Sequence, residues 1–265
     1  MKKYAVIGNP VEHSLSPKLH NYWIKKHKIN AFYEKYLLKE NDLKDIISKI
    51  KSGKLEGINI TVPFKKSIIP FVDQLSQEAN ETQSVNTIHI YNNKIIGHNT
   101  DIGGFELAIR HLKYDVNGKK VFILGAGGVV PSIICALKKM KASKIIISNR
   151  TKEKAENLKK IFPDIEIIKW GGVPDFDMIL NATSLGLEEN EEIELNYNEI
   201  EKNKFFYDVI YNPSETNFLK KGKELGCKTE NGKMMFIYQA HQAFTIWHKV
   251  MPEINDEVIE LLNND

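Results

Sequence analysis

Residues 121–131 read VFILGAGGVVP, and this stretch restricts the possible folds more than any other part of the chain. Its apolar run is typical of a buried strand, and Pro131 is suited to the first turn of a helix. Gly125 and Gly127 match the first two glycines of a dinucleotide-binding fingerprint, which permit a tight turn and a close approach of the backbone to a pyrophosphate. Val130 occupies the third glycine position, so the motif by itself fits an ordinary tight turn as well.

Strand-like and helix-like segments alternate before this stretch. We expect strands at 3–10, 32–38 and 55–62, separated by helices at 16–28 and 41–53. This order of elements is typical of an α/β fold with a parallel or mixed sheet.

The alternation begins again near Lys119, with further strands expected around 144–150, 176–184 and 204–211. An amphipathic helix at 234–249 is expected to pack on the first block. The chain therefore predicts two α/β domains with a cleft between them: an N-terminal domain with a mainly parallel sheet and a Rossmann-type domain. The expected limits are 1–101, completed by C-terminal helices within 236–265, and 102–235.

Composition excludes several classes of function. The 265 residues carry a net charge of +3 from 37 basic and 34 acidic residues, and the lysines are dispersed, so no nucleic-acid partner is expected. Cys135 and Cys227 have no CxxC spacing, and no signal peptide or membrane-spanning segment is visible, which favours a reduced, cytoplasmic chain without a membrane partner. The eight histidines form no ligand set, and no metal is predicted.

The residues after the second strand of the Rossmann-type block indicate which cofactor binds. An acidic residue at this point would bind the ribose 2′-hydroxyl of NAD, but the chain has Asn149, Arg150 and Thr151. Arginine pairs with a 2′-phosphate in a forked geometry, and the threonine hydroxyl can donate a further hydrogen bond. The pattern favours NADP, with the alternative that Arg150 only caps the end of the strand.

Two serines near the N-terminus form the first candidate substrate site. Ser14 and Ser16 occupy alternate positions, so in an extended segment their hydroxyls point the same way, beside a helix that begins at Pro17. Hydroxyls at a helix N-terminus suit a carboxylate. The alternative is that Ser16 is simply the N-cap of that helix.

A second candidate lies in GINITVPFKKS, residues 57–67. Alternation places Asn59 and Thr61 on the face toward a ligand, and the opposite face is expected to pack in the core through three aliphatic residues, Ile58, Ile60 and Val62. Pro63 lacks an N–H group and should end the strand. The alternation weakly favours Lys65 over Lys66 as the lysine that points into the site.

Motifs along almost the whole chain together resemble the shikimate dehydrogenase family. In order, they are GNPVEHSLSPKLHN, NITVPFK, VNT, GHNTD, GAGG, NRT, NATSLG, YDVIYNPSETNFL and NGKMMFIYQAHQAF. The resemblance implies a small-molecule oxidoreductase that acts on a CH–OH group. The implied reaction is the reversible NADP-dependent reduction of 3-dehydroshikimate to shikimate, in the shikimate pathway that leads to chorismate and the aromatic amino acids. It leaves open whether the protein is a monomer or a homodimer.

The resemblance also implies roles for individual residues. The catalytic pair would be Lys65 and Asp101. Substrate-binding residues would be Ser14, Ser16, Asn59, Thr61, Asn86, Tyr211 and Gln239. Cofactor-binding residues would be Gly125, Ala126, Gly127, Gly128, Asn149, Arg150, Thr151, Thr183, Ser184, Val209 and Gly232. Residues Val129, Val130 and Pro131 depart from the small and basic residues that commonly follow GAGG, which affects the expected shape of the phosphate loop.

The residue types fit the implied chemistry. Reduction of a ketone needs a hydride, which a nicotinamide supplies, and a proton for the developing alkoxide. The Lys65 ammonium can donate that proton, and the Asp101 carboxylate can orient it. Two alternatives are a quinate/shikimate dehydrogenase that uses NAD and a non-catalytic regulatory relative that only binds ligand. Asn149, Arg150 and Thr151 argue against the first, and the intact pair of Lys65 and Asp101 argues against the second.

Overall fold

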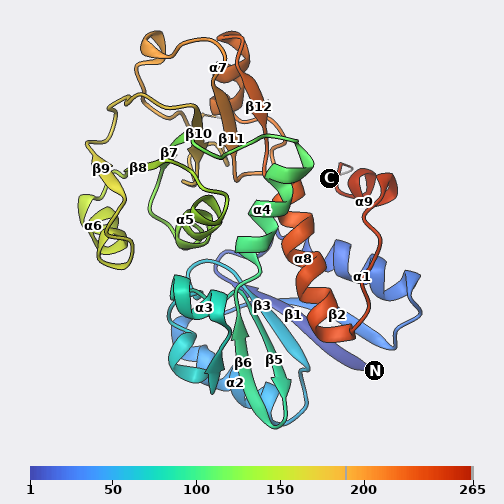
Figure 1. Cartoon of the computed structure of the whole chain (residues 1–265). Coiled ribbons are helices and arrows are strands. Elements are labelled where there is room, and N and C mark those ends of the chain that lie inside the picture. The colour runs from blue at the N-terminus through green and yellow to red at the C-terminus, as the bar shows by residue number, and fades with distance from the viewer. Residues whose placement is uncertain (189, 264–265) are drawn as a thin grey trace. The chain divides into compact units, whose positions relative to one another are not determined.

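The computed structural model describes residues 1–188 and 190–263, and the chain forms two compact units (Figure 1). Unit 1 comprises Met1–Gly104 and Ile237–Asp265, and unit 2 comprises Phe105–Phe236. The expected C-terminal segment 236–265 includes residues 264 and 265, which lie outside the described residues.

The sheet of unit 1 has the strand order β2-β1-β3-β5-β6-β4. Its strands are β1 (Lys2–Gly8), β2 (Ala31–Leu37), β3 (Gly57–Ile60), β4 (Gln74–Leu75), β5 (Thr87–Tyr91) and β6 (Lys94–His98). Only β5 runs against its neighbours among these strands, and the pairs β1–β2, β1–β3 and β4–β6 are parallel. The sheet is therefore mixed and mainly parallel, as expected.

A tight hairpin between β5 and β6 was not expected from the sequence. Tyr91 pairs with Lys94 across a two-residue turn, in which Asn92 and Asn93 have φ angles of 50° and 59°. Asparagine tolerates this left-handed conformation better than most residues, and two such residues give the twist that a two-residue hairpin requires. The dipeptide NN was thus a usable signal for the hairpin.

The two faces of the unit 1 sheet carry different cores, because side chains alternate along β1. Ala5 and Ile7 pack with α2 (Leu43–Lys51), whereas the ring of Tyr4 lies 5.0 Å from that of Trp247 on α8 (Lys233–His248). The indole Nε1 of Trp247 donates to the carbonyl of Ile88, 3.0 Å away. The α-helices with residues in this unit are α1 (Ser16–Lys26), α2 (Leu43–Lys51), α3 (Gln77–Thr82), α4 (Asp101–His111), α8 (Lys233–His248) and α9 (Asp256–Leu261). The short helices are η1 (Glu40–Asp42) and η2 (Ile69–Phe71).

The sheet of unit 2 is parallel throughout and has the order β12-β11-β10-β7-β8-β9. Its strands are β7 (Lys120–Leu124), β8 (Lys144–Ser148), β9 (Glu166–Ile168), β10 (Met178–Asn181), β11 (Phe205–Asp208) and β12 (Lys228–Glu230). Counted from β7, this is the 3-2-1-4-5-6 order of a dinucleotide-binding sheet. The order reverses between β7 and β10, and such sheets bind ligands at the carboxyl ends of the strands at this point.

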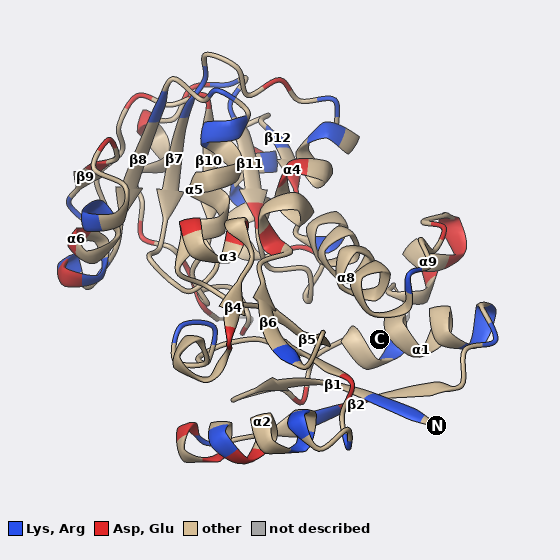
Figure 2. Ribbon diagram, turned by 60° about the horizontal axis from the view of Figure 1, so that its bottom comes forward, with Lys and Arg blue, Asp and Glu red and all other residues tan. Residues whose placement is uncertain are grey.

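Helices follow the strands of unit 2 as in a βαβ fold. They are α5 (Val130–Lys139), α6 (Lys152–Ile161), η3 (Tyr197–Glu199) and α7 (Asn217–Glu224). Charged residues of both signs lie along α6, and along α2 in unit 1, which is typical of solvated helix faces (Figure 2). No helix among the described residues is long and apolar enough to cross a membrane.

Candidate active site

An ion pair between Lys65 and Asp101 is the central feature of the polar site in unit 1. Lys65 Nζ lies 2.7 Å from Asp101 Oδ2, and the two side chains are only 12% and 7% exposed. Asp101 is the first residue of α4, where the helix dipole favours a carboxylate. The main chain of Lys65 is also fixed, because its carbonyl accepts from the N–H of Val85 at 2.8 Å. The pair therefore presents a positioned ammonium rather than a mobile surface lysine.

Asn86 holds the other oxygen of the same carboxylate. Its Nδ2 donates to Asp101 Oδ1 and to Thr100 Oγ1, both at 2.9 Å, and its Oδ1 accepts from the Thr100 N–H at 2.8 Å. With Lys65 on one oxygen and Asn86 on the other, the Asp101 carboxylate cannot rotate without breaking a hydrogen bond. The structure thus brings three of the predicted residues into direct contact.

Asn59 joins this network through groups within the protein. Its Nδ2 donates to the Asn86 carbonyl at 3.2 Å and to Thr87 Oγ1 at 2.9 Å, and its Oδ1 accepts from the Tyr33 hydroxyl at 2.7 Å. The buried Tyr33 hydroxyl also bonds to the Ser16 side chain. Burial raises the pKa of Tyr33, although the bond to Ser16 opposes that shift. Sequence analysis missed Tyr33; the only available signal was that a buried tyrosine usually requires a hydrogen-bond partner.

The serine segment has a different conformation from the one expected. Helix α1 begins at Ser16, and its N-cap residue is Leu15 in a helical conformation, so the interpretation of Ser16 as the N-cap is wrong. The segment before it is a turn rather than extended chain. Ser14 Oγ instead accepts from the Ser16 N–H at 3.3 Å, which satisfies one of the unpaired donors of the first helical turn.

The strand that was expected to include Thr61 and Val62 ends before these residues. Strand β3 stops at Ile60, and Val62 is 56% exposed, so the expectation that Val62 packs in the core is wrong. The half-buried Thr61 remains held to β1, since its N–H donates to the Ile7 carbonyl at 2.9 Å. Beyond the strand, Lys65 is partly buried and Lys66 is exposed, which separates the two neighbouring lysines.

Two glutamines lie on α8 within unit 1. Gln239 and Gln242 are half-buried and three residues apart, so they share one side of the helix. A Cβ atom on Gly103 would meet the Gln242 amide at 2.5 Å, so a side chain at this position would displace the end of Gln242.

The glycine turn of unit 2 follows β7. Gly125 has a φ angle of 112°, and a Cβ atom there would lie 2.8 Å from the Ala182 carbonyl oxygen, so only glycine fits without a shift. Gly127 and Gly128 are exposed and precede α5. Val130, at the third glycine position, is fully buried within the helix. The departure from the fingerprint is thus a packing contact, and the turn before it still exposes the backbone at a helix N-terminus.

The segment 149–151 lies next to this turn, because Leu124 at the end of β7 pairs with Ser148 at the end of β8. Asn149 Nδ2 donates to the Thr151 carbonyl at 2.7 Å, which shapes the turn before α6. Arg150 and Thr151 are exposed. An exposed guanidinium beside a glycine turn can pair with a phosphate.

Five further predicted residues lie beyond the carboxyl ends of β10, β11 and β12. Thr183 is half-buried and Ser184 is exposed, both just after β10. Val209 follows β11, and a Cβ atom on Gly232 would lie only 2.1 Å from its carbonyl oxygen. Tyr211 stacks on Phe236, with ring centroids 4.6 Å apart.

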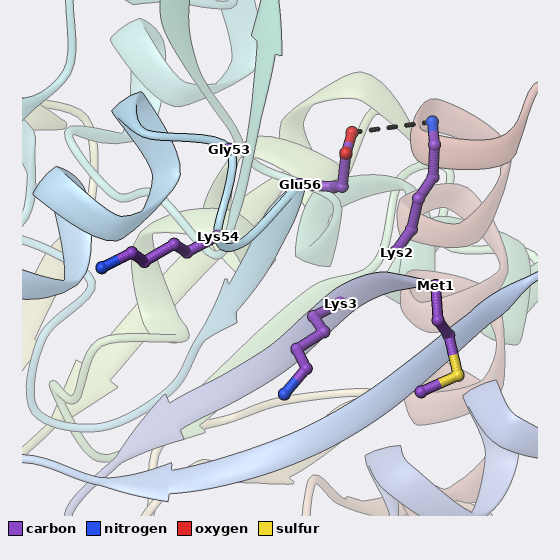
Figure 3. A pocket seen from close by; sticks show the side chains of 6 residues that line it. All are labelled: Met1, Lys2, Lys3, Gly53, Lys54 and Glu56. Atoms are coloured by element: carbon purple, nitrogen blue, oxygen red, sulfur yellow. Dashed lines mark ion pairs between the residues drawn. The ribbon is translucent and has the colours of Figure 1, made fainter.

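The cavity shown in Figure 3 is lined by none of the residues of the polar site. It has a volume of about 500 Å³ and is lined by Met1, Lys2, Lys3, Gly53, Lys54 and Glu56. Lys2 pairs with Glu56 at 3.6 Å (Figure 3). The cavity lies at the start of β1, whereas the polar network follows the ends of the strands. Within residues 1–188 and 190–263, no cluster of His, Cys, Asp and Glu could hold a metal ion.

Comparisons with known proteins cover nearly the whole chain. Residues 6–88 match the family model described as "Shikimate dehydrogenase substrate binding domain", and residues 106–209 match "Shikimate / quinate 5-dehydrogenase". A protein of Pelagibacter ubique named "Shikimate dehydrogenase (NADP(+))" is 63% identical over 262 residues, 99% of each chain.

Two solved structures show the same fold. The crystal structure of shikimate dehydrogenase from Aquifex aeolicus has a TM-score of 0.91 at 38% identity, covering 100% of this chain and 98% of that one. The enzyme from Thermus thermophilus, in complex with NADP(H) and shikimate, has a TM-score of 0.90 at 26% identity and 99% coverage of both chains.

Proposed function

The chain belongs to the shikimate dehydrogenase family, and on that premise we propose that it catalyses the reversible NADP-dependent reduction of 3-dehydroshikimate to shikimate. The observation that carries the proposal is the Lys65–Asp101 pair, with the carboxylate held on its second oxygen by Asn86. This arrangement is suited to proton transfer at a ketone, because it places an oriented ammonium group where negative charge can develop on oxygen.

When bound, the cofactor supplies the hydride, and the residues of this chain handle the proton. Lys65 donates its proton to the alkoxide oxygen as the hydride is added, and it removes that proton in the reverse direction. Asp101 orients the ammonium group, and Asn86 prevents the carboxylate from rotating. Desolvation of the pair, which is almost buried, strengthens both interactions relative to water.

We assign cofactor binding to residues 102–235 and substrate binding and catalysis to residues 1–101 with 236–265. The glycine turn fits a dinucleotide, because Gly125 has no room for a side chain and Gly127 and Gly128 expose their backbone before α5. Ala126 lies in the same turn. Thr183, Ser184, Val209 and Gly232 would contact the nicotinamide half.

The adenosine 2′-phosphate would be bound by Asn149, Arg150 and Thr151. Arg150 is exposed at the end of β8, where an acidic residue would repel that phosphate. We therefore expect NADP rather than NAD. Replacement of Arg150 by alanine should reduce the preference for NADP over NAD, because it weakens NADP binding and leaves NAD binding unchanged.

We assign one group of side chains to the substrate carboxylate and another to its ring hydroxyls and carbonyl. Ser14 and Ser16, at the start of α1, would bind the carboxylate, where the helix dipole favours negative charge. The ring hydroxyls and the carbonyl would contact Asn59, Thr61, Asn86, Asp101 and Gln239, and Tyr211 would lie near the carboxylate. Asn59 already uses both amide hydrogens within the protein, so its remaining capacity is one lone pair on Oδ1.

We further propose that the protein works in the cytoplasm, in aromatic amino-acid and chorismate biosynthesis, as a monomer or a homodimer. Two free, buried cysteines fit a reducing compartment.

A four-way oxidation assay tests the proposal. Purified protein is mixed with shikimate or quinate and with NADP⁺ or NAD⁺, and nucleotide reduction is followed by absorbance. We expect the highest kcat/KM with shikimate and NADP⁺. Faster turnover of quinate with NAD⁺ would favour the quinate/shikimate alternative, and ligand binding without any turnover would favour the non-catalytic one. Either outcome would refute the proposal.

A further inference from the structure

The carboxylate of Asp208 is the most unusual buried group in unit 2. It lies at the carboxyl end of β11 and is 0% exposed. Among the described residues its hydrogen-bond partners are the side chains of Asn181 and Thr216 and the N–H of Ile210, and none of these is a cation. Burial raises the pKa of Asp208 to about 6, against the effect of these hydrogen bonds. A buried carboxylate without a cation is costly, and such groups are concentrated at functional sites.

On one side, Asp208 fixes Asn181, the residue opposite it on β10. Asn181 Nδ2 lies 3.1 Å from both carboxylate oxygens and also donates to the Leu185 carbonyl at 3.0 Å. Asn181 Oδ1 accepts from the Thr183 N–H at 3.0 Å and from the Thr183 hydroxyl at 2.7 Å. One amide therefore determines the shape of the segment 182–186.

On the other side, Asp208 fixes the segment that follows β11. Its Oδ1 accepts from the Ile210 N–H at 2.9 Å, and its Oδ2 accepts from the Thr216 hydroxyl at 2.7 Å. Thr216 is the N-cap of α7. The Ile210 carbonyl in turn accepts from the Gly232 N–H at 3.0 Å, which brings the third cofactor-binding segment into the same arrangement.

We propose that Asp208 and Asn181 are positioning residues that together hold the segments 182–186 and 209–216 in the conformation that binds the nicotinamide half of NADP. This inference rests on the proposed function, because Thr183, Ser184 and Val209 receive their cofactor role there. Neither residue contacts the cofactor in this scheme. A carboxylate is suited to the task because it accepts all the hydrogen bonds at once, which a neutral amide at the same position does not.

The test is Asp208→Asn in the full-length protein, with NADP⁺ binding measured by calorimetry without substrate. The amide keeps the size of the side chain but places a donor against the Asn181 donor. We expect the Kd for NADP⁺ to rise about tenfold, which corresponds to about 1.4 kcal/mol, and the amide hydrogens of Thr183 and Leu185 to exchange faster. Shikimate binding to the free protein should change less than twofold, because its proposed contacts lie mainly in unit 1.

Asp177→Asn is the matched control. Asp177 also accepts a backbone hydrogen bond within unit 2, from the Lys120 N–H at 2.8 Å, but it directly precedes β10 at the amino end of that strand. This variant should bind NADP⁺ like the wild type. If Asp208→Asn does not fold, Thr216→Val removes a single donor to the carboxylate, and Thr216→Ser restores it. The Kd should rise in the first and return in the second.

The outcomes separate this inference from the function on which it rests. A wild-type protein that fails to bind NADP⁺ contradicts the proposed function itself. A wild-type protein that binds NADP⁺, together with Asp208→Asn and Thr216→Val variants that bind within twofold of it, overturns only the positioning role, even if both variants unfold at lower temperature.

Discussion

Replacement of Tyr33 by phenylalanine tests whether the buried network of unit 1 supports substrate binding. The change removes one oxygen atom and keeps the ring, which stacks on His20 with centroids 4.3 Å apart. That oxygen donates to Asn59 Oδ1 at 2.7 Å and bonds to the Ser16 side chain. Two residues assigned to opposite ends of the substrate thus lose a shared partner.

The expected magnitude follows from burial. Tyr33 is 1% exposed and Asn59 is 6% exposed, so water cannot easily replace the lost donor. Leaving a buried acceptor unsatisfied costs about 1–3 kcal/mol in the free energy of unfolding. With an m-value of about 2 kcal/mol/M, the urea midpoint should fall by about 0.5–1.5 M at unchanged m. If the lost hydrogen bond also weakens the free energy of substrate binding by about 1 kcal/mol, the KM for shikimate rises about fivefold.

The assay combines unfolding and kinetics. Trp23 and Trp247 lie in unit 1 and Trp170 lies in unit 2, so tryptophan fluorescence in a Trp170→Phe background follows unit 1 alone. The kcat should change less than twofold, because Asn86 holds the Asp101 carboxylate without help from Tyr33. Tyr36→Phe is the control on the same strand, since the Tyr36 hydroxyl donates to the Glu34 carboxylate rather than to Asn59 or Ser16.

Two results would refute the reasoning. If Tyr33→Phe lowers the urea midpoint but leaves the KM for shikimate at the wild-type value, the hydroxyl serves stability alone. If the KM for NADP⁺ rises as much as that for shikimate, the defect is not local to the substrate site.

Three further predictions concern single residues. Lys65→Ala should lower kcat by about 10²–10⁴-fold with little change in the KM for shikimate, because a proton donor acts mainly in the transition state. Lys66→Ala should behave like the wild type. If only Lys66→Ala loses activity, Lys66 rather than Lys65 is the proton donor. Gly232→Ala places a Cβ atom 2.1 Å from the Val209 carbonyl oxygen, so it should weaken NADP⁺ binding and lower the Tm. A Kd for NADP⁺ equal to that of the wild type would contradict a role for this close approach in cofactor binding. Burial lowers the pKa of His20 to about 3, so the unfolded chain binds more protons below pH 6.5 and wild-type stability falls as the pH drops from 6.5 towards 3. His20→Phe lacks this effect, so the difference in the free energy of unfolding between variant and wild type, measured from urea curves, should shift in favour of the variant by about 2 kcal/mol between pH 7 and pH 5; an equal difference at both pH values would exclude the buried neutral imidazole.

The alternation of apolar and amphipathic segments was sufficient to predict the fold class, which the structure and the relatives confirm. Local rules were less reliable where tertiary contacts decide the conformation. Leu15 adopts a helical conformation, so α1 begins at Ser16, one residue earlier than expected. Strand β3 stops at Ile60, and Val62 is exposed to solvent. The Asn92–Asn93 turn was readable from its residue types but was not recognised.

The candidate site shows a similar division. Motifs identified the residues that carry charge or a glycine turn, and the structure places Lys65, Asp101 and Asn86 in contact. Their roles remain predictions. Tyr33 and Asn181 could not be singled out, because each acts through hydrogen bonds to a residue on another strand of the same sheet. Strand register decides such pairs, and a single sequence does not contain it.

The division of the chain into units has a consequence for protein synthesis. Unit 2 is one continuous stretch, Phe105–Phe236, whereas unit 1 includes Ile237 and the residues after it. The N-terminal sheet cannot complete its core until Trp247, which donates to the Ile88 carbonyl, has left the ribosome. Domains generally fold as units while the chain is being made. The second unit in the sequence is therefore the first to be complete, and the nascent N-terminal hundred residues must wait for α8 with the part of their sheet that this helix covers still exposed.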